Sequence, residues 1–463
     1  MTQPAAIDAQ AARSQGFALH AEQRLIEAEA VFAAASAAHP ADPALAFGLA
    51  QTRYELGYRG AADLFAQVRI LAPENLDVAR NQALALISEG RGAEAATLLK
   101  PLLAAQPDWL DGHKALATLN WTSGDQHHFT DHLAPACRAQ PHNPALWLAW
   151  FRNLAQARQW KAALAVLDEA ERHLGVTPAL QVSRLFVAVE SDDAARSEQL
   201  LTSTAQIQGD VTSLCRIRHA LRQGDAKRAE AEALPLTATP SAMLYWPYLS
   251  LAWRLLGDDR AEWLDRPEQL VQQHETGWSD VELVELAKVL RGLHTAAAPY
   301  IEQSVRGGTQ TDRSVLLRHE PVLQRIKARL LDLIRDYVDG LPAPDPQHPL
   351  LGAPRGDLLI EGSWSVRLAR QGYNVPHTHA MGWLSTAFYV ALPQPQQLGA
   401  APAGHIAFGQ PPAELGLPLE PYCTIAPAPG RLAIFPSTMW HSTVPFDDGE
   451  RLVIAFDIRR PRR

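Results

Sequence analysis

Residues 372–393 read GYNVPHTHAMGWLSTAFYVALP, and this stretch contains two histidines, His377 and His379, that a single residue separates. In an extended chain, residues i and i+2 point to the same face, so we expect the two imidazoles side by side on one strand. The residues that follow, LSTAFYVAL, are almost all small or apolar and predict a buried strand. The stretch therefore predicts a β domain that carries a candidate metal site.

A second stretch near the C-terminus, residues 427–459, reads PAPGRLAIFPSTMWHSTVPFDDGERLVIAFDIR. Its runs of Val, Ile, Leu and Phe between Pro and Gly are typical of short strands. We expect three of them, at residues 431–435, 441–446 and 451–458, the last two joined by a solvated hairpin at residues 447–450. A β-rich C-terminal part follows from this pattern.

A third histidine, His441, opens the middle strand of this stretch, and Arg451 follows ten residues later. Three neutral imidazole ligands leave coordination positions open on an octahedral ion. Such a donor set suits non-haem Fe(II), with Mn, Ni, Cu or Zn as alternatives. A nearby arginine can bind a substrate carboxylate through two parallel hydrogen bonds.

The segment 356–463 resembles the 2-oxoglutarate- and Fe(II)-dependent oxygenases. In that superfamily the common signature is His-x-Asp/Glu, a distal His, and Arg or Lys about ten residues on; here His377, His441 and Arg451 match it. The resemblance implies a double-stranded β-helix (jelly-roll or cupin-like) fold, with His377 and His441 as metal ligands and Arg451 as the clamp for 2-oxoglutarate. It also implies Fe(II) as cofactor, O2 as co-substrate, and hydroxylation as the reaction.

A bacterial and phage branch of this superfamily is more similar to the chain. Its N-x-P-H-x-H, L-S-G-x-Y-Y and G-x-L-x-x-F-P-S-x-x-x-H motifs correspond to Asn374–His379, Leu384–Tyr389 (here LSTAFY) and Gly430–His441. The carboxylate of the common signature is absent, and His379 occupies its place. We therefore expect His377, His379 and His441 to form the metal site.

Further candidates surround these ligands. Thr443 lies two residues after His441, on the same face of an extended strand, and is a candidate donor to the 2-oxoglutarate carboxylate; Asn374 and Tyr389 are candidates to contact 2-oxoglutarate or substrate. The alternative to an oxygenase is a cupin, because Gly430-x5-Pro436-x4-His441 resembles the second cupin motif. The acid of the first cupin motif is missing, and Arg451 favours 2-oxoglutarate.

The N-terminal part contains a repeat of 33 or 34 residues. In each unit, a proline is followed by a small residue, then a turn glycine, then another residue that is mostly small. These are Pro40, Pro73, Pro107 and Pro141; Ala50, Ala83 and Ala117; Gly57, Gly90 and Gly124; and Ala62, Ala95 and Phe129. The glycine is expected to close the first helix in a left-handed conformation, and the proline to end the second. The pattern resembles the tetratricopeptide repeat over residues 20–270.

Composition limits the remaining possibilities. The net charge is −8, which argues against a nucleic-acid partner, and no apolar run is long enough to span a membrane. The three cysteines lie far apart, which disfavours a disulfide framework, and no secretion signal is visible, so a cytoplasmic location is expected.

The sequence thus predicts a multidomain α and β protein: a helical repeat solenoid at 1–300, a bridging helix and Pro-rich linker at 301–355, and the double-stranded β-helix at 356–463. The expected function is that of a 2-oxoglutarate-dependent dioxygenase. Its substrate is a peptide or protein held by the groove of the repeats, or a small molecule. Two alternatives stay open, a cupin-like metal-binding protein or enzyme without 2-oxoglutarate, and a repeat scaffold with an inactive barrel.

Overall fold

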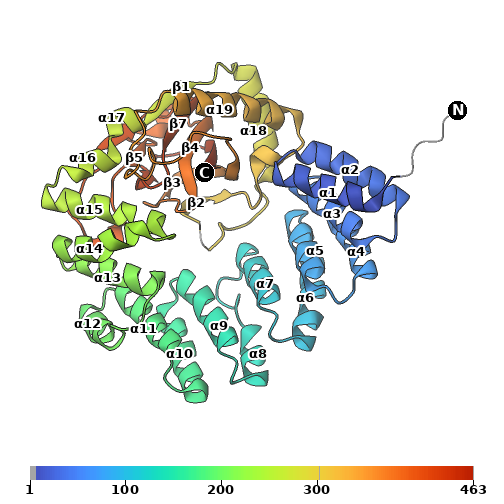
Figure 1. Cartoon of the computed structure of the whole chain (residues 1–463), viewed down its shortest axis with the longest axis horizontal. Helices are drawn as coiled ribbons and strands as arrows, with labels where there is room; N and C mark the ends of the chain where they lie inside the picture. The colour runs from blue at the N-terminus through green and yellow to red at the C-terminus, as the bar shows by residue number, and fades with distance from the viewer. Residues whose placement is uncertain (1–6, 302, 462–463) are drawn as a thin grey trace. The chain divides into compact units, whose positions relative to one another are not determined.

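The computed structural model describes residues 7–301 and 303–461, with helices in the N-terminal part and strands towards the C-terminus (Figure 1). The chain forms two compact units. The first contains the residues up to 140 together with 295–298 and 311–327, and the second contains the others. Among the described residues, no helix combines the length and the apolar character needed to cross a membrane.

The first unit is built from antiparallel helix pairs. Its helices are α1 (Ala9–Ala21), α2 (Leu25–Ala38), α3 (Pro43–Glu55), α4 (Ala61–Leu71), α5 (Leu76–Ser88), α6 (Gly92–Ala105), α7 (Leu110–Thr122) and α8 (Leu133–Ala139). The turn glycines Gly57, Gly90 and Gly124 have φ of 77°, 79° and 99°, which confirms the left-handed helix ends. The helices α2, α4, α6 and α8 each end two residues before a repeat proline, also as predicted.

Helix starts follow from polar residues placed just after the repeat prolines. Asp42 accepts hydrogen bonds from the backbone N–H groups of Ala44 and Leu45, and Asn75 accepts one from that of Asp77. These side chains satisfy backbone donors that have no partner within the helix.

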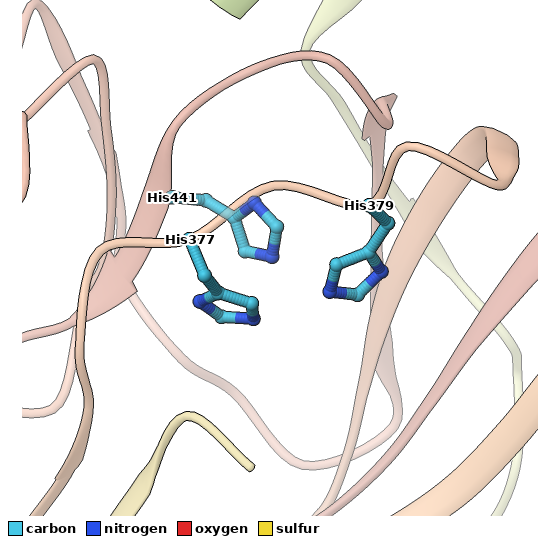
Figure 2. Close-up of side chains that lie close together, drawn as sticks. All are labelled: His377, His379 and His441. Atoms are coloured by element: carbon cyan, nitrogen blue, oxygen red, sulfur yellow. The ribbon is translucent and has the colours of Figure 1, made fainter. Parts of the chain in front are cut away.

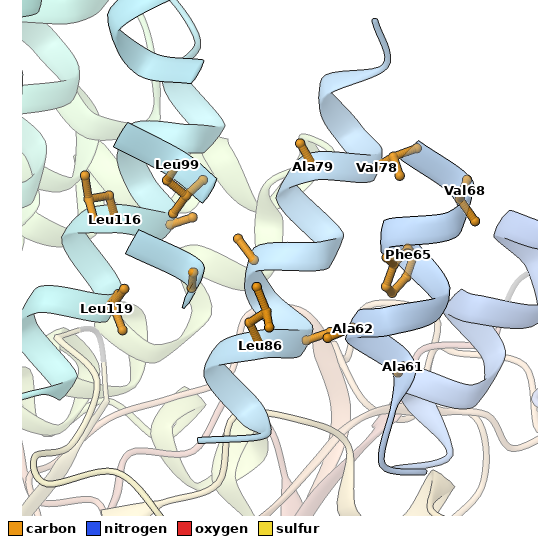
Figure 3. Close-up of a cluster of buried hydrophobic side chains, with 14 of the residues drawn as sticks. Ala61, Ala62, Phe65, Val68, Val78, Ala79, Leu86, Leu99, Leu116 and Leu119 are labelled. Atoms are coloured by element: carbon orange, nitrogen blue, oxygen red, sulfur yellow. The ribbon is translucent and has the colours of Figure 1, made fainter. Parts of the chain in front are cut away.

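The small repeat residues lie where helices approach one another. Ala50, Ala83, Ala62 and Ala95 are at most 1% exposed. They pack in one apolar cluster with larger side chains, among them Phe65, Val68, Leu86, Leu99, Leu116 and Leu119 (Figure 3). Close packing of this kind is the reason that alanine recurs at these positions.

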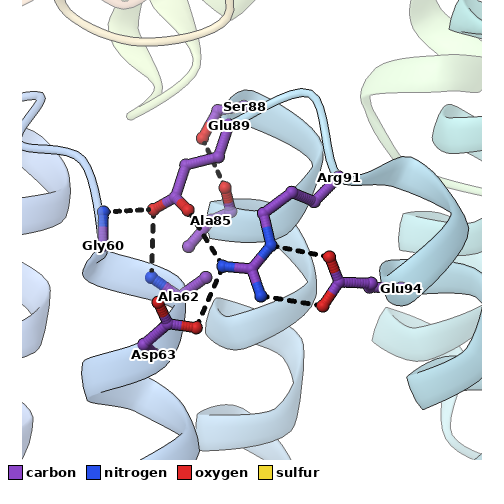
Figure 4. A network of polar contacts seen from close by, with 8 residues as sticks. All are labelled: Gly60, Ala62, Asp63, Ala85, Ser88, Glu89, Arg91 and Glu94. Carbon is purple, nitrogen blue, oxygen red and sulfur yellow. Dashed lines mark hydrogen bonds and ion pairs between the residues drawn. The ribbon is translucent and has the colours of Figure 1, made fainter.

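A polar network links successive helix pairs. The carboxylate of Glu89 accepts hydrogen bonds from the backbone N–H groups of Gly60 and Ala62, both at 3.1 Å, and so caps α4, whose own N-cap residue is glycine (Figure 4). Arg91 bonds to Asp63 at 2.9 Å and to both oxygens of Glu94. The cap for one helix is thus supplied by the next repeat.

The second unit combines further helix pairs with the β structure. Its helices are α9 (Pro144–Gln156), α10 (Trp160–Leu174), α11 (Pro178–Glu190), α12 (Ala194–Ser203), α13 (Asp210–Arg222), α14 (Ala226–Ala233), α15 (Trp246–Leu256), α16 (Arg260–Asp265), α17 (Pro267–Leu270), α18 (Asp280–Leu293) and α20 (Pro395–Leu398). The helix α19 (Pro321–Asp339) corresponds to the predicted bridging helix. Its apolar residues at helical spacing, from Val322 to Tyr337, are buried.

Two antiparallel sheets form the β part. The strands are β1 (Gln272–Glu275), β2 (Val305–Gln310), β3 (Ile360–Asn374), β4 (Gly382–Ala391), β5 (Ile406–Phe408), β6 (Cys423–Ile425), β7 (Arg431–Pro436), β8 (His441–Thr443) and β9 (Arg451–Arg459). One sheet has the order β1-β7-β4-β9-β3-β2 and the other β6-β5-β8. The predicted class, a helical repeat part followed by a β domain, is confirmed. Two strands of the larger sheet, β1 and β2, come from before residue 356.

The predicted hairpin between the last two strands does not form. β8 pairs with β5 in the smaller sheet, whereas β9 pairs with β3 and β4 in the larger one. The acidic segment 447–450 therefore connects two sheets. Glu450 accepts hydrogen bonds from Arg291 and Arg367, which anchors the start of β9.

Candidate functional site

The histidine pair lies in the loop between β3 and β4. We expected both residues on one regular strand, and this was wrong in detail. His377 forms an isolated antiparallel bridge with His441, with backbone N–O distances of 3.0 Å in both directions, and the backbone N–H of His379 donates to the carbonyl of Ser437 at 2.9 Å. Backbone hydrogen bonds to residues 437–441 thus hold both histidines against the segment that carries the third.

The three imidazole rings converge (Figure 2). Ring centroids are 4.2 Å apart for His377 and His441, 5.0 Å for His377 and His379, and 5.1 Å for His379 and His441. One ligand nitrogen from each ring lies within 4.8 Å of the other two. A single ion can therefore reach all three rings with bonds of about 2.0–2.2 Å after small side-chain adjustments.

The second nitrogen of each ring is held by an acceptor. Nδ1 of His377 lies 2.8 Å from the carbonyl oxygen of Val375, and Nδ1 of His441 lies 3.0 Å from that of Met439. Nδ1 of His379 lies 2.7 and 2.8 Å from the two oxygens of Asp457. Because carbonyl and carboxylate oxygens only accept, each Nδ1 carries the proton and each Nε2 keeps its lone pair for a metal.

Burial keeps the rings of His377 and His441 uncharged. The surrounding protein lowers the pKa of His377 to about 3, with a smaller contribution from the neighbouring His379, and it lowers the pKa of His441 well below its usual value. At neutral pH these two rings are therefore in the form that binds a metal.

Asp457 is a residue of this site that the sequence analysis did not select. Besides His379, it accepts a hydrogen bond from the hydroxyl of Ser385 at 2.7 Å. The alternation of β9 places Asp457 on the same face as Arg451. This shared face could have identified Asp457 from the sequence, because a carboxylate at a buried position of a strand needs a hydrogen-bond or ion-pair partner.

Three alanines lie next to Trp364 in a row across the larger sheet, on this face. Trp364 pairs with Ala455, Ala455 with Ala387, and Ala387 with Ala433. Paired residues point to the same side of a sheet, and the ring of Trp364 lies 5.4 Å from that of His379. The row therefore presents three alanine side chains on the face that carries Trp364.

Arg451 and Tyr389 lie farther along the same face. Arg451 is 2% exposed, and its guanidinium carbon lies 5.1 Å from the centre of the Tyr389 ring. Within the described residues, neither Nε of Arg451 nor the hydroxyl of Tyr389 has a hydrogen-bond partner. Burial raises the pKa of Tyr389, so its hydroxyl stays protonated. Two unpaired donors at a buried position favour an anionic ligand there.

Asn374 and Thr443 lie beside His377. The hydroxyl of Thr443 donates to the side-chain oxygen of Asn374 at 3.3 Å, and the side-chain amide of Asn374 donates to the hydroxyl of Ser304 at 2.9 Å. That hydroxyl lies 3.3 Å from Nε2 of His377. The three polar side chains therefore form one network that ends at a candidate ligand atom.

The residues present fit an Fe(II) ion with 2-oxoglutarate. Three unprotonated imidazole nitrogens are suitable ligands for a first-row divalent ion, and the unpaired donors of Arg451 and Tyr389 are suitable for a carboxylate.

Comparisons with known proteins give one family match and several similar solved structures. No curated protein sequence matches the chain. Similar solved structures include a prolyl-4-hydroxylase from Pseudomonas putida (16% identity, 42% of this chain and 94% of that one, TM-score 0.29). HygX from Streptomyces hygroscopicus, with nickel and 2-oxoglutarate bound, has 12% identity over 42% of this chain and 85% of its own, with a TM-score of 0.30. A tetratricopeptide repeat protein from Parabacteroides merdae has 14% identity over 46% and 86%, with a TM-score of 0.30. Residues 362–457, in the C-terminal part of the chain, match the model of the family described as "Putative 2OG-Fe(II) oxygenase".

Proposed function

We propose that the protein is an Fe(II)- and 2-oxoglutarate-dependent oxygenase that hydroxylates a C–H bond of its substrate. The observation that carries the proposal is the convergence of three Nε2 lone pairs, each fixed by a separate acceptor on Nδ1. His377, His379 and His441 would hold the iron. Bound iron and 2-oxoglutarate supply, with O2, the oxidising chemistry of the reaction.

The chain's own residues bind and orient the co-substrate. The buried guanidinium of Arg451 donates to the distal carboxylate of 2-oxoglutarate, and the hydroxyl of Tyr389 provides a second donor. Asn374 and Thr443 contact 2-oxoglutarate or substrate on the side of His377.

The substrate is a peptide or protein segment bound by the helical repeats. A cavity of about 470 Å³ lined by residues of α10, α11, α13 and the segment 413–416 supports a binding role for this part; its lining includes Trp160, Glu190, Arg222 and Glu414. One nitrogen of Arg222, Nη1, is buried there without a partner within the described chain. The three cysteines are free, which supports a cytoplasmic location.

Anaerobic addition of Fe(II) and 2-oxoglutarate to the metal-free protein tests the oxygenase. A weak visible charge-transfer band is expected, followed in air by conversion of 2-oxoglutarate to succinate. Arg451→Ala should weaken the band at a given 2-oxoglutarate concentration, whereas Arg370→Ala, at an exposed position, should not. Absence of a band together with tight binding of zinc or nickel would favour the cupin-like alternative.

Incubation of the full chain with a peptide library tests the substrate class. A peptide that gains one oxygen atom only when Fe(II) and 2-oxoglutarate are both present would support a peptide substrate. Turnover of 2-oxoglutarate without any modified peptide or protein would contradict it.

A further inference from the structure

The buried carboxylate of Asp457 contacts Nδ1 of His379, one of the candidate metal ligands. Asp457 is 6% exposed, and both its oxygens lie within 2.8 Å of Nδ1 of His379. The hydroxyl of Ser385 donates to the same carboxylate at 2.7 Å and lies 2.9 Å from the hydroxyl of Ser437. Two donors thus converge on Asp457 from β4 and from the loop that precedes it.

This carboxylate lacks an ordinary counter-ion. Within residues 7–301 and 303–461, its only ion-pair partner is His379, and no lysine or arginine pairs with it. An isolated buried carboxylate is costly, because the protein interior solvates charge poorly. A divalent cation on the far side of the His379 ring would compensate the charge, since the imidazole transmits the interaction between metal and carboxylate.

The candidate metal ligands are imidazoles, which bind a metal in their neutral form. The three groups that converge on the candidate site are imidazoles, and Asp457 is not among the ligand atoms that lie within reach of one another. We infer that Asp457 is a positioning residue of the metal site, which holds His379 in its Nδ1–H form and supplies the site's negative charge through that ring. This inference rests on the proposed function, because it assumes that His379 binds a metal.

Local packing supports a fixed position for the carboxylate of Asp457. A Cβ atom at Gly382 would lie 2.4 Å from the hydroxyl oxygen of Ser437 and 3.3 Å from Cβ of Asp457, so glycine is needed for the backbone to approach the network this closely. Gly382 also donates its backbone N–H to the carbonyl of His379 at 3.1 Å. The loop that carries His379 is therefore packed directly against the carboxylate.

Anaerobic titration of the metal-free full chain with Co(II), without 2-oxoglutarate, tests the inference by binding affinity and by the visible spectrum of the bound ion. Asp457→Asn keeps the shape and one acceptor oxygen but removes the charge, and should weaken Co(II) binding by roughly 10–100-fold. Ser385→Ala, which removes one hydrogen bond and keeps the charge, should cause a smaller loss. Asp448→Asn is the matched control, since this carboxylate is exposed and pairs with Arg370.

A double-mutant cycle separates a charge effect from a packing effect. His379→Asp supplies a carboxylate ligand directly and removes the imidazole that transmits the charge of Asp457. Asp457→Asn should therefore weaken Co(II) binding strongly in the wild-type background and much less in the His379→Asp background. A loss that is larger in the wild-type background supports the inference.

Two results would overturn it. One is equal Co(II) affinity of the wild type, Asp457→Asn and Ser385→Ala, and the other is an equal effect of Asp457→Asn in the wild-type and His379→Asp backgrounds. Neither result contradicts the proposal that the protein is an oxygenase. That proposal fails if the wild type binds no divalent metal. Circular dichroism of each metal-free variant shows whether it folds. If Asp457→Asn does not fold, the Co(II) affinity of Ser385→Ala tests the inference.

Discussion

The indole Nε1 of Trp440 donates a hydrogen bond of 2.9 Å to the carbonyl oxygen of Pro247, at the first turn of α15. Trp440 directly precedes His441, and the ring of Tyr248 packs edge-on against it at 5.5 Å. A helix of the repeat part is therefore bonded to the residue beside a candidate ligand. Within the second unit, the helical and β parts share one core around Trp440.

Replacement of Trp440 by phenylalanine should destabilise the protein and loosen the metal site. The change leaves the buried carbonyl of Pro247 without its donor, which costs about 1–3 kcal/mol. Trp253→Phe is the control, because it removes a comparable bond to Glu230 away from the histidines. Denaturant unfolding should show a loss for both variants, and Co(II) titration a weaker affinity for Trp440→Phe alone. Equal metal affinities would show that the α15 contact does not position His441.

Tyr389→Phe should have opposite effects on function and stability. The hydroxyl has no partner in the described structure, so its removal should leave the free energy of unfolding unchanged or slightly higher. If the hydroxyl binds 2-oxoglutarate, the KM for 2-oxoglutarate should rise, by less than in Arg451→Ala. Steady-state kinetics and thermal unfolding measure the two quantities. An unchanged KM would remove Tyr389 from the co-substrate site.

Stability should fall as the pH drops below about 6.5, partly because of His348. Burial lowers its pKa to about 4, while Nε2 donates to the carbonyl of Leu264 and Nδ1 accepts from the backbone N–H groups of Leu350 and Leu351. Between pH 4 and 6.5 the unfolded chain binds a proton here that the folded chain does not. Folding is therefore penalised as pH falls, by about 1.4 kcal/mol per pH unit.

The variant His348→Gln isolates this contribution. It should be less stable than the wild type at pH 7 and should lose less stability between pH 6.5 and 4.5, as measured by denaturant unfolding of the metal-free protein. Parallel pH profiles for the two proteins would mean that His348 does not titrate on unfolding.

Glu89→Ala should destabilise the helical repeats. The carboxylate caps α4 from the next repeat, and a cap of this kind contributes about 1 kcal/mol. Glu94→Ala is a suitable comparison because its pair with Arg91 is exposed and contributes about 0–1 kcal/mol. Thermal unfolding of both variants distinguishes the roles. A larger loss for Glu94→Ala would contradict the capping role of Glu89.

Local sequence patterns were sufficient for much of the fold. The 33- and 34-residue spacing of proline and glycine predicted where helices end, because left-handed backbone and the missing proline N–H act within one turn. The run of small and apolar residues at β4 likewise predicted a buried strand. The hairpin expected before β9 was wrong because pairing depends on which sheet a strand enters, and the two-residue period is the same in either sheet.

The sequence by itself determined the residue types of the site: three histidines, an arginine ten residues after the last of them, and the resemblance that these carry. Only the tertiary structure decided which nitrogen of each ring is free and that Asp457 lies behind His379. The contact between His379 and Asp457 joins residues 78 positions apart, and it arises when β9 pairs with β4. Spacing along a chain reports the local backbone, whereas the partner of a buried polar group is set by how distant strands meet.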